Sequence, residues 1–127
     1  MKPENEEKLF GRFAAFFERK NLLDHGIDCG DGWYPIIFQL CEQIELVLKT
    51  NPESYSVGPL LVDQVKQKYG GLRFYVTWET DEISKLIAKA EELSFKTCET
   101  CGNPGTLRGR GWLETTCDLH ETNREGM

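Results

Sequence analysis

Apolar residues recur at helical spacing in three stretches of the chain, and this periodicity predicts three amphipathic helices. We expect these helices over residues 3–20, 33–50 and 81–95. Each would turn its apolar face toward a shared core and keep its charged residues in water. The apolar positions are Leu9, Phe10, Phe13, Ala14, Phe16 and Phe17 in the first stretch, Trp33, Ile36, Ile37, Leu40, Cys41, Ile44, Val47 and Leu48 in the second, and Ile83, Leu86, Ile87, Ala90 and Leu93 in the third.

The first apolar face is rich in phenylalanine, and two interpretations of it stay open. Phe10, Phe13, Phe16 and Phe17 together form a large apolar surface on one short helix. The simpler interpretation is that these rings fill the core. The other is that part of the stripe is a surface for self-association or for a partner protein, because contiguous exposed apolar patches are typical of interaction sites.

Residues 60–78 consist of two apolar runs on either side of Gly70–Gly71, a pattern typical of a β-hairpin with a two-residue turn. With this turn, Tyr69 pairs with Leu72. One face of the hairpin then carries Val65, Tyr69, Leu72, Phe74, Val76 and Trp78, and the other carries Gln64, Lys66, Lys68, Arg73, Tyr75 and Thr77.

A short helix over 60–69 is the alternative for the first of these runs. Its Gln and Lys residues are good helix formers, and Gly70 would end the helix in the left-handed conformation. Residues 72–78 are expected to form a strand in either case.

Two loops are expected between these elements, over residues 21–32 and 51–59. The first contains four polar side chains that can cap, turn or bind a metal, and Asp31 or Gly32 is expected to cap the helix that follows. A second metal site there lacks paired-ligand spacing. The four side chains are His25, Asp28, Cys29 and Asp31.

The strongest chemical signal lies near the C-terminus, in residues 98–120, which we call the clasp. Its ligand residues follow the spacing C-x2-C-x15-C-x2-H, with residues 106–116 expected to form a small hairpin between the two pairs. Two pairs of this kind deliver the four nitrogen and sulfur ligands that a structural zinc site requires. The predicted zinc ligands are Cys98, Cys101, Cys117 and His120.

Other interpretations of the clasp are weaker. A redox C-x2-C motif is expected at the start of a helix, whereas a predicted helix ends just before Cys98. A hydrolytic zinc needs an open coordination position, and four good ligands leave none, although Glu99 or Glu114 would be available as a base. Reduced, metal-free cysteines are the remaining alternative.

The length and the net charge of the chain limit the classes of protein to which it can belong. The chain has 127 residues, which predicts a single domain, with residues 1–97 as an α+β core, the clasp docked on it and residues 121–127 as a frayed tail. A net charge of −6 disfavours general binding to duplex nucleic acid. With no apolar signal segment and no apolar run of about 20 residues, we expect a protein of the reducing cytoplasm without a membrane span.

The strings DCGDGWYPIIFQLCEQI, DQVKQKYGGLRFYV, AEELSFKTCETCGNPG and TTCDLH together resemble a family of short, uncharacterised proteins from bacteria and their phages. The resemblance covers roughly residues 28–120 and excludes the Phe-rich first helix. It implies an α+β protein with a zinc clasp, and it brings no catalytic residue with it. Its phage association favours a small accessory or host-interacting factor.

The expected fold is therefore α+β, with about three helices packed on a small hairpin or single strand at 60–78 and a C-terminal zinc-ribbon-like Cys3His clasp. The favoured function is a non-enzymatic binding protein. Its partner would be a host or phage protein or a small anionic ligand such as a nucleotide, because the candidate surfaces are basic and aromatic. The candidate ligand-binding residues are Lys66, Lys68, Arg73, Tyr75, Arg108, Arg110 and Trp112.

Three alternatives remain open. The first is an inhibitor of bacterial anti-phage defence, which would sequester a nucleotide signal or block a host protein. The second is a zinc protein that binds nucleic acid. The third, and weakest, is an enzyme that uses the cluster of His25, Cys29 and Asp31, because a Cys–His pair needs hydrogen-bond reach that sequence does not reveal.

Overall fold

The computed structural model of the chain describes residues 1–18, 26–50 and 58–121. It has an α+β fold, as the sequence predicted, with three α-helices, a three-stranded sheet and a two-stranded sheet among those residues. The elements in chain order are α1 (Pro3–Arg12), β1 (Ile27–Asp28), the 3-10 turn η1 (Asp31–Trp33), α3 (Tyr34–Thr50), β2 (Val62–Lys68), β3 (Gly71–Val76), α4 (Asp81–Ser94), β4 (Thr106–Arg108), β5 (Glu114–Thr116) and the 3-10 turn η3 (Asp118–His120).

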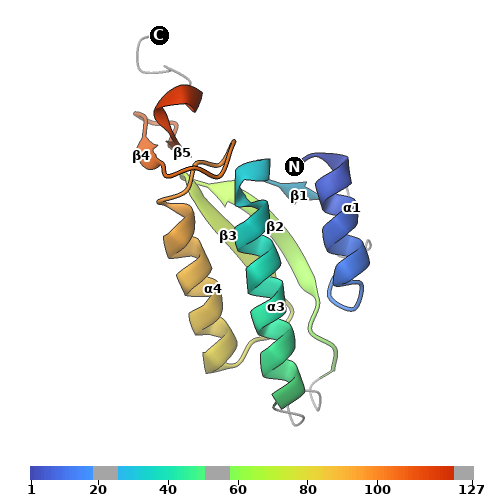
Figure 1. The fold of residues 1–127 in the computed structure, drawn as a ribbon. Helices are drawn as coiled ribbons and strands as arrows, with labels where there is room; N and C mark the ends of the chain where they lie inside the picture. The colour runs from blue at the N-terminus through green and yellow to red at the C-terminus, as the bar shows by residue number, and fades with distance from the viewer. Residues whose placement is uncertain (19–25, 51–57, 122–127) are drawn as a thin grey trace.

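The body of the protein has two layers (Figure 1). Helices α3 and α4 lie side by side over one face of the sheet β1–β2–β3, and α1 packs beside them. The core between the layers contains Trp33, Ile37 and Ile44 from the helical layer and Val65 and Leu72 from the sheet, all at most 1 % exposed. None of the described helices is long and apolar enough to cross a bilayer.

Residues 62–76 form the predicted hairpin, but its turn lies one residue earlier than expected. Lys68 pairs with Gly71, so Tyr69 and Gly70 are the two turn residues, both with positive φ (55° and 84°). Leu72 consequently pairs with Gln67 rather than with Tyr69. The predicted place of Tyr69 on one face with Val65 and Leu72 is wrong, because Tyr69 is a turn residue and its side chain is 65 % exposed.

Packing explains the shift of the turn. A Cβ on Gly71 would lie 2.3 Å from the ring of Phe95, so this glycine belongs to the strand, under an aromatic side chain. The positive φ that the turn needs falls instead on Gly70 and on its neighbour Tyr69. The alternation along the strands is otherwise as predicted, since Val65, Leu72 and Phe74 are buried on the helix side.

Helix α1 ends at Arg12, eight residues before its predicted end at Lys20, whose position lies outside the described residues. Phe13 leaves the helical conformation, with φ −117° and ψ 42°, and a tight turn follows. The turn directs the Phe16 carbonyl to the N–H of Val62 at 2.9 Å, which joins this segment to β2. Phe13, Phe16 and Phe17 are nevertheless buried in the core, which favours the core interpretation of the stripe.

Two local predictions are wrong. Leu93 is 45 % exposed, and the next residue, Ser94, is buried in its place because its hydroxyl accepts the N–H of Leu72. Asp31 does not cap the helix after it. Its carboxylate accepts hydrogen bonds from the backbone of Lys2 and the side chain of Asn5, both at 2.9 Å, and thereby fixes the start of α1 to the body. The cap of α4 is Thr80, whose hydroxyl oxygen accepts the N–H of Ile83 at 3.2 Å.

Candidate metal centre and adjoining surface

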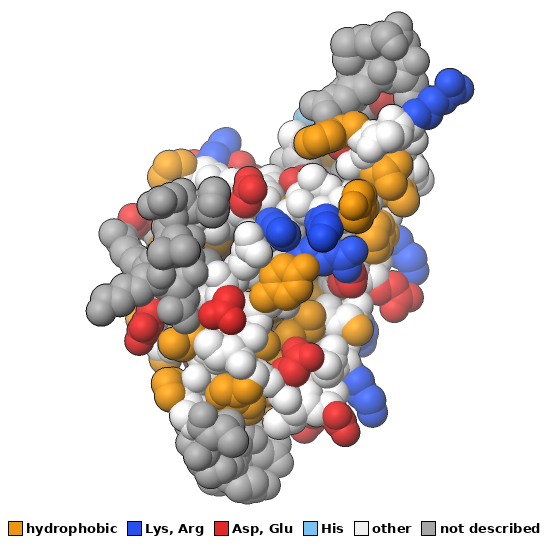
Figure 2. All heavy atoms as spheres, turned by 180° about the vertical axis from the view of Figure 1, so that it is seen from behind, with side chains coloured by type: hydrophobic (Ala, Val, Ile, Leu, Met, Phe, Trp, Pro, Cys, Tyr) orange, Lys and Arg blue, Asp and Glu red, His pale blue; other side chains and the backbone are white. Residues whose placement is uncertain are grey.

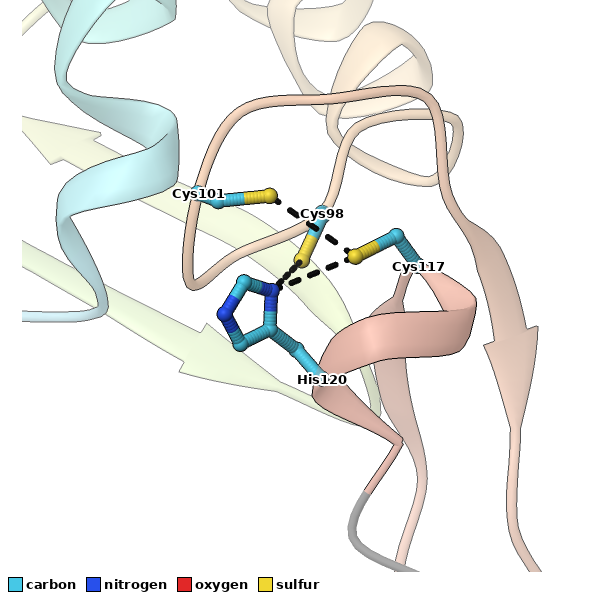
Figure 3. A group of neighbouring side chains, drawn as sticks. All are labelled: Cys98, Cys101, Cys117 and His120. Carbon is cyan, nitrogen blue, oxygen red and sulfur yellow. Dashed lines mark hydrogen bonds between the residues drawn. The ribbon is translucent and has the colours of Figure 1, made fainter.

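The four predicted ligands of the clasp converge on one point (Figure 3). Their ligand atoms all lie within 4.8 Å of one another. Cys98 and Cys101 come from the loop after α4, whereas Cys117 and His120 come from the end of β5 and from η3. In the part of the chain that the structure describes, no other group of three or more such residues is placed in this way.

Three of the separations between these atoms are close to those of a tetrahedral zinc site. With Zn–S bonds of about 2.3 Å and Zn–N bonds of about 2.0 Å, a tetrahedron places two sulfurs about 3.8 Å apart and a sulfur and a nitrogen about 3.5 Å apart. The Sγ atoms of Cys101 and Cys117 lie 3.7 Å apart. His120 Nδ1 lies 3.2 Å from Cys117 Sγ and 3.8 Å from Cys98 Sγ. The group can therefore hold a metal ion.

Backbone N–H groups prepare the first cysteine for this role. Burial raises the pKa of the Cys98 thiol, but hydrogen bonds from the N–H groups of Cys117, Cys101 and Thr100 outweigh burial and bring the pKa down to about 6. Gly102, with φ 85°, closes the turn that carries Cys98 and Cys101 by donating its N–H to the Cys98 carbonyl at 2.9 Å. The loop thus stabilises a thiolate, the form that binds metal.

The clasp is attached to the body through the Gly-Asp-Gly-Trp segment that precedes α3. The N–H of Gly32 donates to the Glu99 carbonyl at 2.7 Å, and the N–H of Gly30 donates to the Glu99 carboxylate at 2.9 Å. The indole of Trp33 donates to the Thr97 carbonyl at 2.9 Å. These bonds hold the backbone of the first ligand pair against the start of α3.

A second attachment joins the clasp to the turn of the β2–β3 hairpin. The buried hydroxyl of Thr115 donates to the Gly70 carbonyl at 2.7 Å. The side chain of Leu107 packs on Gly70, since a Cβ there would lie 2.3 Å from Leu107 Cδ1. The two hairpin ends, β2–β3 and β4–β5, are therefore packed firmly against each other.

Four of the predicted ligand-binding residues share the sheet face opposite the helices, which we call the basic-aromatic face: Lys66, Lys68, Arg73 and Tyr75. In the view from behind, Lys and Arg side chains gather beside hydrophobic ones near the base of the clasp (Figure 2). Lys66 pairs with Arg73 across the strands and lies over the ring of Tyr75, 5.9 Å from its centroid. Arg73 is bound to Glu91 of α4 by an ion pair.

The other three predicted residues lie in the clasp and have different surroundings. Arg108 already forms ion pairs, since its guanidinium contacts Asp118 at 2.9 Å and Glu121 at 3.4 Å. Arg110 is exposed in the loop between β4 and β5. Trp112 is 56 % exposed, and its indole N–H donates to Glu114 at 3.3 Å.

A cavity of ≈ 350 Å³ lies between the β2–β3 turn and the β4–β5 loop. Two of the predicted ligand-binding residues line it: Trp112 from the clasp and Lys68 from the basic-aromatic face. Sequence reasoning missed Gln67 and Tyr69, which complete its hairpin side. The position of Tyr69 next to two glycines could have indicated its exposure, because the side chains of a two-residue turn lie outside the paired strands.

The structure gives little support to a catalytic role for the cluster of His25, Cys29 and Asp31. His25 lies outside the described residues. Burial raises the pKa of Cys29 to about 12, and the nearby Glu99 carboxylate adds to that shift, so Cys29 would be a poor nucleophile. Asp31 is engaged with α1.

Comparison of the chain with protein-family models, with curated proteins and with solved structures finds no match. Function is therefore inferred below from the chain's own residues.

Proposed function

We propose that this chain is a non-enzymatic binding protein whose Cys3His group holds a structural zinc ion. The observation that carries the proposal is the convergence of four ligand atoms within 4.8 Å. Four protein ligands fill the zinc tetrahedron and leave no position for a reacting water, which is typical of structural rather than catalytic sites. Bound zinc would cross-link the two ends of the zinc-ribbon-like clasp. A reducing cytoplasm would keep these cysteines available as ligands.

We place the binding surface on the basic-aromatic face and the adjoining β4–β5 loop. Support comes from the exposed rings of Tyr75 and Trp112 and from Lys66 and Lys68, whose charges project from an otherwise acidic chain. Its partner is a host or phage protein or a small anionic ligand, and the net charge of −6 disfavours long duplex nucleic acid. The phage-related resemblance of the motifs is the reason to regard the chain as an accessory factor.

The zinc part of the proposal is tested by elemental analysis of protein purified without added metal. We expect stoichiometric zinc, and we expect Cys117→Ser to lose most of it, because each thiolate supplies a quarter of the coordination shell. Cys41→Ala is the matched control, since Cys41 is a buried core residue on α3 and is not a member of the group. A metal-free wild type, or equal zinc in all three proteins, would contradict the proposal.

The binding part is tested with isotope-labelled protein in a bacterial lysate that has been separated into small molecules and macromolecules. We expect one of the two fractions to shift amide NMR signals of the hairpin turn and the β4–β5 loop. The double variant Lys66→Glu/Lys68→Glu should lose that response, whereas Lys85→Glu/Lys89→Glu on exposed positions of α4 makes the same charge change and should keep it. If neither fraction, including one from phage-infected cells, moves these signals, the surface does not have this function.

A further inference from the structure

The cavity between the two hairpin ends combines aromatic walls with an adjacent positive charge. Tyr69 lines it from the β2–β3 turn and Trp112 lines it from the β4–β5 loop, with Gln67, Gly111 and Leu113. Both residues are more than half exposed, at 65 % and 56 %. The cavity is therefore lined from both sides by exposed aromatic residues.

Tyr69 is held in a backbone conformation that does not suit its side chain. Its φ of 55° lies in the left-handed region, where a bulky residue is an outlier. A turn of this kind strongly prefers Asn or Gly at that position. Strained residues of this kind cluster at binding sites, where the surrounding structure holds them in place. The Thr115–Gly70 hydrogen bond and the packing of Leu107 on Gly70 supply that restraint here.

The positive charges next to the cavity are available for a ligand. The ammonium group of Lys68 lies 5.6 Å from the ring centroid of Tyr69, and that of Lys66 lies 5.9 Å from the ring centroid of Tyr75. Among the described residues, neither lysine forms an ion pair with a carboxylate. Arg73 and Arg108, in contrast, are already neutralised by acidic neighbours. The two lysines are two residues apart on one strand face, a separation of about 7 Å, which suits a chain of phosphates better than a single carboxylate.

We propose that this cavity binds a nucleoside polyphosphate, with the base against Tyr69 and Trp112 and the phosphates against Lys68 and Lys66. The volume of ≈ 350 Å³ is at the small end of the range of about 300–1,000 Å³ for small-molecule pockets, which fits one base and its sugar. Base–aromatic stacking and lysine–phosphate contacts are the two interactions that such a ligand needs. The inference rests on the proposed function, because it assigns a ligand class to the same surface.

The test follows the indole N–H signals of the labelled zinc-loaded protein during titration with ATP and GTP. The Trp112 signal should shift, while that of Trp33, which is buried and bound to the Thr97 carbonyl, should not. Affinity should fall in the order ATP, ADP, AMP, because each phosphate removed takes away negative charge facing the lysines. Adenosine alone and pyrophosphate alone should each bind at least about tenfold more weakly than ATP, since each lacks one of the two interactions.

Variants separate a binding role from a structural one. Tyr69→Asn should weaken ATP binding by about tenfold, as expected for loss of one stacking partner, without lowering the melting temperature, because Asn suits the turn. Lys66→Glu/Lys68→Glu should weaken binding by at least about tenfold, and Lys85→Glu/Lys89→Glu should leave it unchanged. A folded Tyr69→Asn protein that binds ATP as tightly as wild type would overturn the proposal.

Three further outcomes would also overturn it. The first is that nucleotides do not bind, and the second is that pyrophosphate alone binds as tightly as ATP. The third is that an oligothymidylate binds far more tightly than any mononucleotide, which would identify single-stranded nucleic acid as the ligand. If nucleotides do not bind but the macromolecular lysate fraction still shifts the signals, the proposed binding function stands and the partner of the surface is a protein. Inert nucleotides and inert lysate fractions would reject both.

Discussion

At the scale of single residues, the Gly-Asp-Gly-Trp segment is a packing requirement of the clasp. A Cβ built on Gly32 would lie 2.0 Å from the Cys98 carbonyl oxygen, and one on Gly30 would lie 2.3 Å from the Glu99 carbonyl oxygen. Both obstacles are backbone atoms, so no side-chain rotation can relieve the overlap. The first ligand pair can reach its position only because these two residues lack side chains.

We therefore predict that Gly32→Ala lowers the free energy of unfolding by at least about 2 kcal/mol, the cost typical of forcing extra atoms into a packed site. Gly11→Ala is the matched control. Among the described residues, no atom lies within 4 Å of a Cβ at Gly11, and alanine there should stabilise α1 by about 0.5–1 kcal/mol. Urea denaturation measures both changes. Similar stabilities for the two variants would show that the clasp does not press on Gly32.

At the scale of elements, the sequence predicted which segments form helices and strands better than it predicted where they end. Periodicity depends on a segment's own residues, so α3 and α4 lie close to their expected ranges. Where an element ends, and in which register two strands pair, depends on the segments that pack against them. Helix α1 stops at Arg12 because the chain must turn for Phe16 to bond to β2, and the hairpin turn shifts because Phe95 covers Gly71. Both causes are contacts between distant parts of the chain.

The ion pair between α1 and α3 should make stability depend on pH. Hydrogen bonds from Arg12, at 3.0 and 3.1 Å, hold the pKa of Glu45 below its usual value, and Lys49 adds to the shift. Because the folded-state pKa is lowered, this stabilisation is present above the unfolded-state pKa of about 4.3 and is lost as the pH falls through the lowered pKa.

We accordingly predict that Glu45→Gln melts at a lower temperature than wild type near neutral pH, and that the difference vanishes in acid. Calorimetric melting temperatures across that range measure it. Glu92→Gln, at an exposed position of α4, is the control and should show little difference at any pH. A Glu45→Gln difference that stays constant down to acid pH would mean that the ion pair does not stabilise the fold.

At the scale of the whole molecule, the group of residues that can hold a metal ion was predictable from sequence and the cavity was not. Cys98 with Cys101, and Cys117 with His120, are local pairs whose chemistry is visible in their spacing. The cavity, in contrast, joins residues 67–69 to residues 111–113, which meet only when the clasp docks on the hairpin turn. No local pattern records that contact, so Trp112 was predicted without its partner Tyr69.

Body and clasp also differ in what stabilises them. The cluster of buried apolar residues runs from Leu9 to Ala90 and lies entirely in the body. Within the clasp, the buried residues among those described are Cys98, Thr115 and Thr116, which supply little apolar surface. We therefore expect the body to keep its core without metal. We expect the clasp to depend on the proposed zinc ion, because metal binding contributes on the order of 10 kcal/mol or more in small zinc domains.

We predict that chelation unfolds the clasp and leaves the body folded. In hydrogen exchange, the amides of Cys98 and Glu99, which donate to carbonyls within the clasp, should lose protection, and so should that of Gly105, which donates to the Lys96 carbonyl. The amides of α3 should keep most of their protection. Cys98→Ser should exchange like the chelated wild type, and the chelator should change it little further. Protection lost equally in α3 and in the clasp would mean that the two unfold as one unit, and protection unchanged in both would mean that the clasp folds without metal.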